Sequence, residues 1–174
     1  RQMCIRDSTR AVQDPATYDF AGEIWMPEHP YEWRNNGFDP ARIEVPFVYE
    51  AHVGMGGEEQ RVHTYREFAD EVLPRISKLG YNTVQLMAVQ EHPYYGSFGY
   101  HVSSFFAPSS RFGTPEDLKY LIDQAHGLNI AVLLDVVHAC DADDVLVSVV
   151  GVVGLAAVME TLACGKRVLL ANKE

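Results

Sequence analysis

The sequence predicts an α/β fold built on a parallel sheet, and three observations support this. Apolar strand candidates alternate with amphipathic helix candidates between residues 47 and 137, as in successive βα units. The strand candidate at 84–89 is apolar on both faces, which is typical of a covered parallel strand. The helix candidates have clear start and stop residues. On this pattern alone, the opening of a (βα)8 barrel and an open doubly wound sheet fit nearly equally.

The composition is that of a globular domain and limits the choice of partner. The chain has 174 residues, 47% of them hydrophobic and 22% charged, which is enough for a core. A formal net charge of -10 argues against binding to nucleic acid or to an anionic membrane, and it is compatible with a neutral partner. Cys4, Cys140 and Cys164 have neither disulfide-framework nor zinc-site spacing. We therefore expect a reducing, cytoplasmic setting and no metal site.

The first 46 residues are expected to lie outside the regular alternation. Residues 1–10, RQMCIRDSTR, show neither helical nor strand periodicity and resemble a translated sequencing adapter, so we expect a non-native leader. Residues 11–46 are interrupted by prolines and predict a turn-rich linker with a short strand at 20–26. Trp25, Tyr31 and Trp33 fit either sugar-binding rings or anchors of this linker, and the anchoring role is favoured.

The first βα unit begins with a strand candidate at 47–53. A helix follows from Thr64, which forms an S/T-x-x-E capping box with Glu67, and Gly80 ends this helix. Its buried stripe is formed by Phe68, Val72 and Ile76.

The second unit begins with the strand at 84–89, and its helix has the stronger start signal. Thr114 is the predicted N-cap, Pro115 stands at the first helical position, and acidic residues fill the first turn. Gly127 is the predicted end. The strand at 130–137 then closes with Asp135 near its carboxyl end.

An aromatic loop, residues 91–102 (EHPYYGSFGYHV), joins the second strand to the second helix. Its rings have flat faces, most have polar tips, and Gly96 and Gly99 allow the backbone to bend or to approach a ligand. The pattern fits either a packing plug or a floor that binds sugar rings, and on the pattern alone packing is favoured. Glu91 and His92 fit an acid and base pair by type, but we expect them to shape the loop.

Four segments together resemble glucan branching enzymes of the alpha-amylase-type glycoside hydrolase superfamily. They are YEAHVGM (49–55), YNTVQLMAVQEHPYYGSFGYHV (81–102), RFGTPEDLKYLIDQAHGLNI (111–130) and DVVH (135–138). The resemblance covers about residues 11–138. It implies that 11–46 link an N-terminal sandwich to a truncated (βα)8 TIM-type barrel, with its first three βα units in 47–139.

The resemblance also implies substrate-binding residues. Tyr100 matches the tyrosine that stacks on a sugar, and Asp135 matches the aspartate that positions groups at the cleavage subsite, with Tyr94 and Tyr95 beside them. Cys140 stands where the family has a histidine, so a hydrogen bond to the sugar is lost. The two carboxylates of the retaining mechanism lie on later strands. The implied function is that of a fragment of a 1,4-alpha-glucan branching enzyme, which transfers α-1,4-glucan segments to 6-hydroxyls in glycogen or starch synthesis. We expect this fragment to be inactive because the catalytic carboxylates are absent. A glucan-binding remnant without catalysis is an alternative.

From about residue 141 the chain resembles 1-deoxy-D-xylulose 5-phosphate reductoisomerase, through VVGVVGL (149–155) and GKRVLLANKE (165–174). The pattern predicts strands at 145–150 and 167–171 around a helix at 155–164, a βαβ piece of a Rossmann-like domain over 140–174. The resemblance places Asn172, Lys173 and Glu174 near NADPH and substrate. No G-x-G-x-x-G fingerprint is present, so we expect no bound cofactor. We interpret the chain as a chimeric reading frame with a junction near 138–143, and an NADPH-dependent reductoisomerase fragment is the alternative function.

Overall fold

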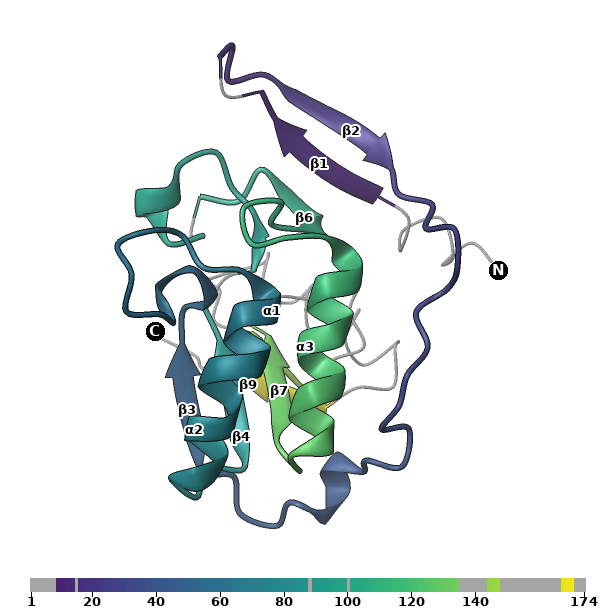
Figure 1. The fold of residues 1–174 in the computed structure, drawn as a ribbon, viewed down its shortest axis with the longest axis vertical. Coiled ribbons are helices and arrows are strands. Elements are labelled where there is room, and N and C mark those ends of the chain that lie inside the picture. The colour runs from purple at the N-terminus through teal and green to yellow at the C-terminus, as the bar shows by residue number, and fades with distance from the viewer. Residues whose placement is uncertain are drawn as a thin grey trace.

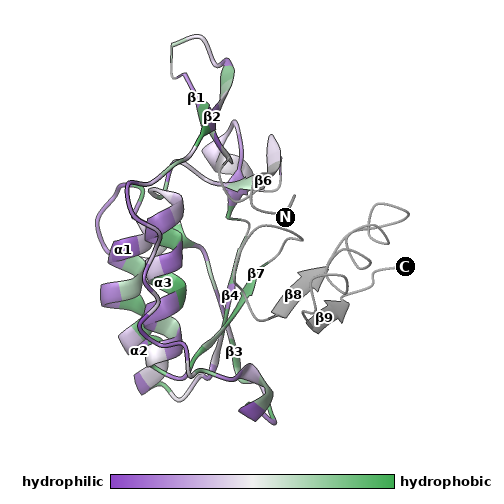
Figure 2. Cartoon of the chain, turned by 90° about the vertical axis from the view of Figure 1, so that its right-hand side faces the viewer, coloured by the Kyte–Doolittle hydropathy of each residue, from purple (hydrophilic) through white to green (hydrophobic). Residues whose placement is uncertain are grey.

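A parallel sheet organises the computed structural model, which describes residues 9–14, 16–87, 89–99, 101–134, 144–147 and 167–170. The sheet has five strands in the order β3-β4-β7-β8-β9, and every neighbouring pair is parallel. The helices α1, α2 and α3 lie on the same face of β3, β4 and β7 (Figures 1 and 2). This arrangement confirms the predicted α/β class.

The strand order follows the order of the chain without reversal. The strands are β3 (Val48–Ala51), β4 (Thr83–Leu86), β7 (Ala131–Leu134), β8 (Asp144–Val147) and β9 (Arg167–Leu170). The register aligns Val48 with Thr83 and Thr83 with Ala131. Because the strands are parallel, their carboxyl ends meet at one edge of the sheet, which places His52 beside the segment that follows β4.

The predicted first helix forms in three consecutive pieces. These are α1 (Tyr65–Glu67), a π-helical segment (Phe68–Val72) and α2 (Leu73–Lys78). The capping box is confirmed, because the Glu67 N–H donates to Thr64 Oγ1 at 3.2 Å and the Thr64 N–H donates to the Glu67 carboxylate at 2.8 Å. Pro74 has no N–H to donate to the carbonyl oxygen of Asp70, so the regular ladder is interrupted beside the π-helical segment.

The second helix, α3 (Pro115–Gly127), begins as predicted. The Asp117 N–H donates to Thr114 Oγ1 at 3.2 Å, and the Thr114 N–H donates to the Asp117 carboxylate at 2.9 Å. Gly127 is the last helical residue. The left-handed residue that turns the chain is Asn129, with φ of 57°, because asparagine tolerates this conformation better than most side chains.

The core lies between the helices and the sheet. Phe68 and Ile76 are buried as predicted, whereas Val72 is only half-buried. Leu121, Ile122 and the apolar residues of β4 and β7 complete it. Aliphatic side chains from neighbouring elements therefore form one continuous apolar layer, which fixes the strands beneath the helices.

A hairpin stands apart from this core (Figure 1). Its strands, β1 (Thr9–Gln13) and β2 (Phe20–Ile24), pair antiparallel. The strand predicted at 20–26 is thus present. Thr9 and Arg10, the last two residues of the predicted leader, lie in β1. The alternation that would have marked this strand spans too few residues to be seen.

The segment that follows the hairpin is held on α3 by a buried carboxylate. Asp123 is fully buried and accepts hydrogen bonds from the Tyr31 hydroxyl at 3.1 Å and from the Asn35 N–H at 2.9 Å. The Trp25 indole N–H donates to Glu116, also on α3. Trp33 packs edge-on against Tyr31 with ring centroids 5.0 Å apart. These contacts confirm that the three aromatic residues anchor their own segment.

The remaining elements are short. A second antiparallel pair consists of β5 (Gln90–Glu91) and β6 (Ser104–Pro108). Single 3-10 turns occur at Pro40–Arg42, Val53–Met55 and Tyr95–Ser97. Strands β8 and β9 correspond to the strands predicted at 145–150 and 167–171, while the predicted turn and helix between them lie outside the described residues. Among the described helices, none has the length and apolarity to cross a membrane.

Candidate functional site

Aromatic rings gather at the carboxyl ends of β3 and β4. We define the aromatic cluster as His52, His92, Tyr95, Phe98 and Phe112. His52, directly after β3, meets the rings of Tyr95, Phe98 and Phe112 edge-on, with centroids 5.7, 5.6 and 5.6 Å away. His92, after β5, lies 6.0 Å from Phe112. The cluster therefore joins the aromatic loop to the end of the first strand and to the segment before α3.

The base of the aromatic loop is held from two sides. The Arg111 guanidinium donates to the carbonyl oxygens of His92 and Pro93, at 3.4 and 2.8 Å. The carbonyl oxygen of Glu91 accepts from the N–H and the hydroxyl of Ser103, at 2.8 and 2.9 Å. The Glu91 carboxylate accepts the Ser110 N–H at 2.6 Å. These contacts support the expectation that Glu91 shapes the loop.

Burial favours the neutral form of the His52 ring. It is buried, and burial first and the nearby His92 second lower its pKa below the ordinary value. Among the described residues, neither ring nitrogen has a hydrogen-bond partner. The part of the chain that the structure describes contains no group of three His, Cys, Asp or Glu residues placed to hold a metal ion. The cluster is thus a largely buried group of aromatic rings, from which Phe98 reaches the surface.

The two tyrosines of the loop point in different directions. Tyr95 packs beside His52, and its hydroxyl lies against Gly54, where an added Cβ would be 2.9 Å away. Burial raises the pKa of Tyr95. Tyr94 is 65% exposed. The structure therefore brings Tyr95 into the cluster and leaves Tyr94 on the surface.

The other predicted site residues lie outside the described part of the chain. They are Tyr100, Asp135, Asn172, Lys173 and Glu174, together with Cys140. Phe112 and His52 were not singled out as site residues from the sequence, although they organise the cluster. The position of Phe112, two residues before the predicted N-cap Thr114, was the sequence signal that could have indicated it. In the structure its carbonyl oxygen accepts the Tyr65 N–H at 2.8 Å.

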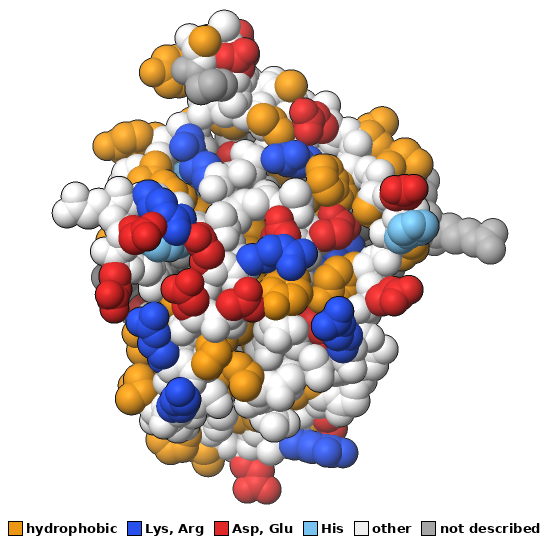
Figure 3. Space-filling view, viewed as in Figure 1, with side chains coloured by type: hydrophobic (Ala, Val, Ile, Leu, Met, Phe, Trp, Pro, Cys, Tyr) orange, Lys and Arg blue, Asp and Glu red, His pale blue; other side chains and the backbone are white. Residues whose placement is uncertain are grey.

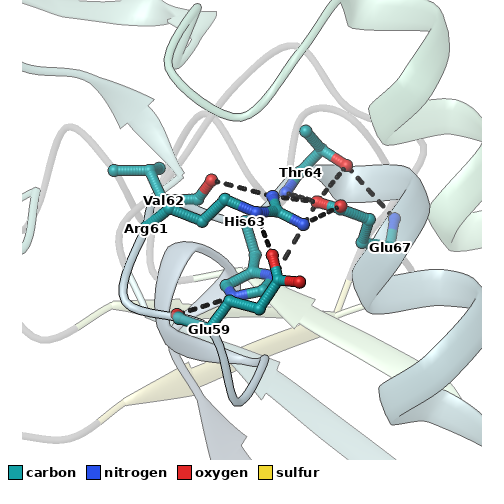
Figure 4. A network of polar contacts seen from close by, with 6 residues as sticks. All are labelled: Glu59, Arg61, Val62, His63, Thr64 and Glu67. Carbon is teal, nitrogen blue, oxygen red and sulfur yellow. Dashed lines mark hydrogen bonds and ion pairs between the residues drawn. The ribbon is translucent and has the colours of Figure 1, made fainter.

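A polar network supports the turn between β3 and α1 (Figure 4). Arg61 donates to Glu59 and to Glu67, each at 2.6 Å. The hydrogen bond from Arg61, followed by the Thr64 N–H, lowers the pKa of Glu67 to about 2. The His63 ring lies 3.2 Å from the carbonyl oxygen of Glu59. This network holds the loop and the start of the helix together.

Comparison with known proteins identifies relatives of most of the chain. Over 135 residues, 78% of this chain, the sequence is 56% identical to the 1,4-alpha-glucan-branching enzyme of Solanum tuberosum. Over 106 residues, 61% of the chain, it is 65% identical to the chloroplastic/amyloplastic enzyme of Oryza sativa subsp. japonica. Most of this chain is similar to 1,4-alpha-glucan-branching enzymes. It spans only 15% and 13% of the length of these two branching enzymes.

The fold has a counterpart among solved structures. A putative alpha amylase from Salmonella typhimurium matches 72% of this chain and 19% of its own, with a TM-score of 0.58 and 31% identity. The resemblance to the alpha-amylase superfamily and its branching enzymes is confirmed by both comparisons.

A second resemblance covers the end of the chain. The family model of 1-deoxy-D-xylulose 5-phosphate reductoisomerase matches residues 117–174. The match begins inside α3, earlier than the predicted boundary near 140. It overlaps the branching-enzyme match, because that match covers 78% of the chain.

Proposed function

We propose that this chain carries the early α-glucan-binding part of a branching-enzyme barrel. The observation that carries the proposal is the identity of 56–65% to branching enzymes. The aromatic cluster at the carboxyl ends of β3 and β4 supports it, because barrel enzymes place their sites at that edge.

In this proposal β3, β4 and β7 are the first three strands of a (βα)8 barrel. Their order follows the chain, and the helices that connect them lie on one face, as barrel closure requires (Figure 2). A doubly wound sheet instead reverses its strand order and places helices on both faces. The strand order and the helix placement therefore favour the barrel.

The chain by itself is proposed to be inactive. The retaining mechanism needs a nucleophilic carboxylate and an acid/base carboxylate about 5 Å apart. By resemblance both belong to later strands, and the residues assigned here, Tyr100, Asp135, Tyr94 and Tyr95, bind rather than react. Incubating the purified chain with amylose should produce no α-1,6 branch points, measured by chain-length analysis after enzymatic debranching. Detection of new branch points would refute this proposal.

The proposed partner is a neutral α-glucan polysaccharide. A net charge of -10 does not oppose such a polymer, and on the face drawn in Figure 3 basic and acidic side chains are intermixed over the helices. Retardation of the chain in a native gel that contains glycogen, compared with a gel without it, tests binding directly. The rice relative is named as a chloroplast or amyloplast enzyme, so the cytoplasmic setting stays a prediction.

A reductoisomerase function is the second candidate, because the family model matches residues 117–174. It would assign Asn172, Lys173 and Glu174 to the NADPH and substrate site. We expect no NADPH binding, since the chain has no dinucleotide-binding glycine fingerprint. Titration with NADPH, followed by its fluorescence, should show no saturable change. The chimera interpretation predicts that long-read sequencing of the source locus finds no continuous transcript across codons 137–143.

A further inference from the structure

The side chain of Tyr94 projects from a hydrogen-bonded turn of the aromatic loop. Its carbonyl oxygen accepts the Ser97 N–H at 3.0 Å and the Ser97 hydroxyl at 2.7 Å. The following residues, Tyr95–Ser97, form a 3-10 turn. The neighbouring Tyr95 ring is packed into the aromatic cluster, 5.7 Å from His52. The backbone at Tyr94 is therefore held both by the hydrogen bonds from Ser97 and by the packing of Tyr95.

Gly96 sets the direction of the Tyr94 ring. A Cβ atom at Gly96 would lie 2.6 Å from both Cζ and Oη of Tyr94, far inside van der Waals contact. The hydroxyl end of the ring is thus folded across the backbone of Gly96. Because Tyr94 is nevertheless 65% exposed, the side of the ring that is turned away from Gly96 is open to solvent.

Gly96 is needed because it leaves room for the Tyr94 ring, and not because of its backbone conformation. The described glycines with positive φ are Gly80, Gly99 and Gly113, so Gly96 has a conformation that alanine can also adopt. A substitution Gly96→Ala would therefore displace the Tyr94 ring without imposing backbone strain. This substitution therefore moves the Tyr94 ring without changing the tyrosine itself.

An exposed tyrosine held in this way suits a glucose ring. The C–H face of a pyranose is apolar and packs on an aromatic face, while the sugar hydroxyls remain hydrated. A ring that is already placed loses little freedom when the sugar binds. We propose that Tyr94 is a stacking platform for a glucose unit of an α-glucan and that Gly96 positions it. This inference rests on the glucan binding proposed above.

Affinity electrophoresis of the full chain in gels of increasing glycogen concentration tests the platform. Tyr94→Ala should weaken binding by about three- to tenfold, the range typical of one aromatic contact, and Tyr94→Phe should bind like the unchanged chain. Gly96→Ala should weaken binding in the same direction. In the double variant the loss should equal that of Tyr94→Ala alone, because Gly96 acts only through that ring.

Two matched controls separate this effect from a general one. Gly37→Ala adds a methyl group where nothing lies within 4 Å, and Tyr18→Ala removes an aromatic ring that is 72% exposed on the hairpin. Both should bind like the unchanged chain, and all variants should share its urea midpoint.

The possible results differ in what they overturn. If the unchanged chain is not retarded by glycogen, the proposed glucan binding fails and the platform fails with it. If the unchanged chain is retarded and Tyr94→Ala is retarded equally, only the platform is wrong. If Tyr94→Ala weakens binding and Gly96→Ala does not, the positioning role of Gly96 is overturned.

Discussion

Glu67 joins the start of the first helix to the loop before it. Its carboxylate accepts from both Arg61 and Thr64, and its pKa falls to about 2. Because this value lies below the ordinary 4.5, the contacts stabilise the fold fully above pH 4.5, and the stabilisation is lost as the pH falls toward 2. Arg61→Ala removes the largest cause, so the pKa of Glu67 should rise part of the way to 4.5 in a carbon-detected NMR titration.

The exposure of this pair limits its effect on stability. We expect Arg61→Ala to change the unfolding free energy only slightly, because water screens exposed ion pairs. Arg42→Ala, which removes a more exposed pair with Asp39 at 3.8 Å, is the control and should leave the pKa of Glu67 unchanged. An unchanged Glu67 pKa in Arg61→Ala would show that Thr64 alone lowers it.

Asp123 is the residue on which the linker depends. It is fully buried and accepts hydrogen bonds from Tyr31, Arg34 and Asn35. Asp123→Ala leaves these donors unpaired and should lower the unfolding free energy by roughly 2–4 kcal/mol in urea titrations. The exposed Asp19→Ala is the control, and equal losses in the two variants would contradict this account.

Tyr31 provides a second measure of the same contact. Burial first and Asp123 second raise the pKa of Tyr31 to about 12. Stability from this hydroxyl is therefore complete below pH 10 and is lost as the pH rises toward 12. In Asp123→Ala the pKa of Tyr31 should fall, measured by the absorbance of tyrosinate near 295 nm.

At the scale of elements, the helix starts were predicted well from the sequence. Thr64 and Thr114 each form a capping box, since the signal depends on residues only three positions apart. Thr64→Ala and Thr114→Ala should each lower the unfolding free energy by about 1 kcal/mol, measured by urea unfolding. Serine at either position should preserve stability, and a serine variant as unstable as the alanine variant would contradict the capping role.

Some local features were not predicted. The π-helical segment beside Pro74 and the left-handed Asn129 are exceptions within otherwise regular helical patterns. The pairing of Thr9 and Arg10 with β2 was not predicted because the alternation in β1 spans too few residues. The residues of the aromatic loop did not indicate that Tyr94 would be exposed while Tyr95 packs beside His52. These positions depend on the space left at Gly96 and at Gly54.

Arg111 fixes the base of the aromatic loop by hydrogen bonds. Its guanidinium holds the carbonyl oxygens of His92 and Pro93, so Arg111→Met keeps the stem and loses both hydrogen bonds. Hydrogen exchange of the loop amides should become several-fold faster, while the amides of α3 stay protected. Arg75→Met, on the exposed side of α2, is the control. Equal protection of the loop in Arg111→Met would show that the aromatic cluster alone fixes it.

At the scale of the whole molecule, the exposed edge of the sheet should promote association between copies of the chain. Among the described strands β3 pairs only with β4, and near it Val45, Phe47 and Val48 are 62%, 60% and 40% exposed. A barrel closes by pairing its first strand with its last, and an unpaired apolar edge instead attracts other strands. The isolated chain should therefore associate as its concentration rises, measured by sedimentation velocity.

Charge on this edge should oppose association without unfolding the chain. Val48→Lys places a cation on the exposed side of β3 and should return the chain to monomer at concentrations where the unchanged chain associates. Leu79→Lys removes a comparable apolar side chain, 69% exposed at the end of α2, and should leave association unchanged. Because the two substitutions add the same charge, a difference between them isolates the strand edge from net charge. Equal loss of association in both would assign it to exposed apolar surface in general, and a monomer at all concentrations would mean that this edge is protected in the isolated chain.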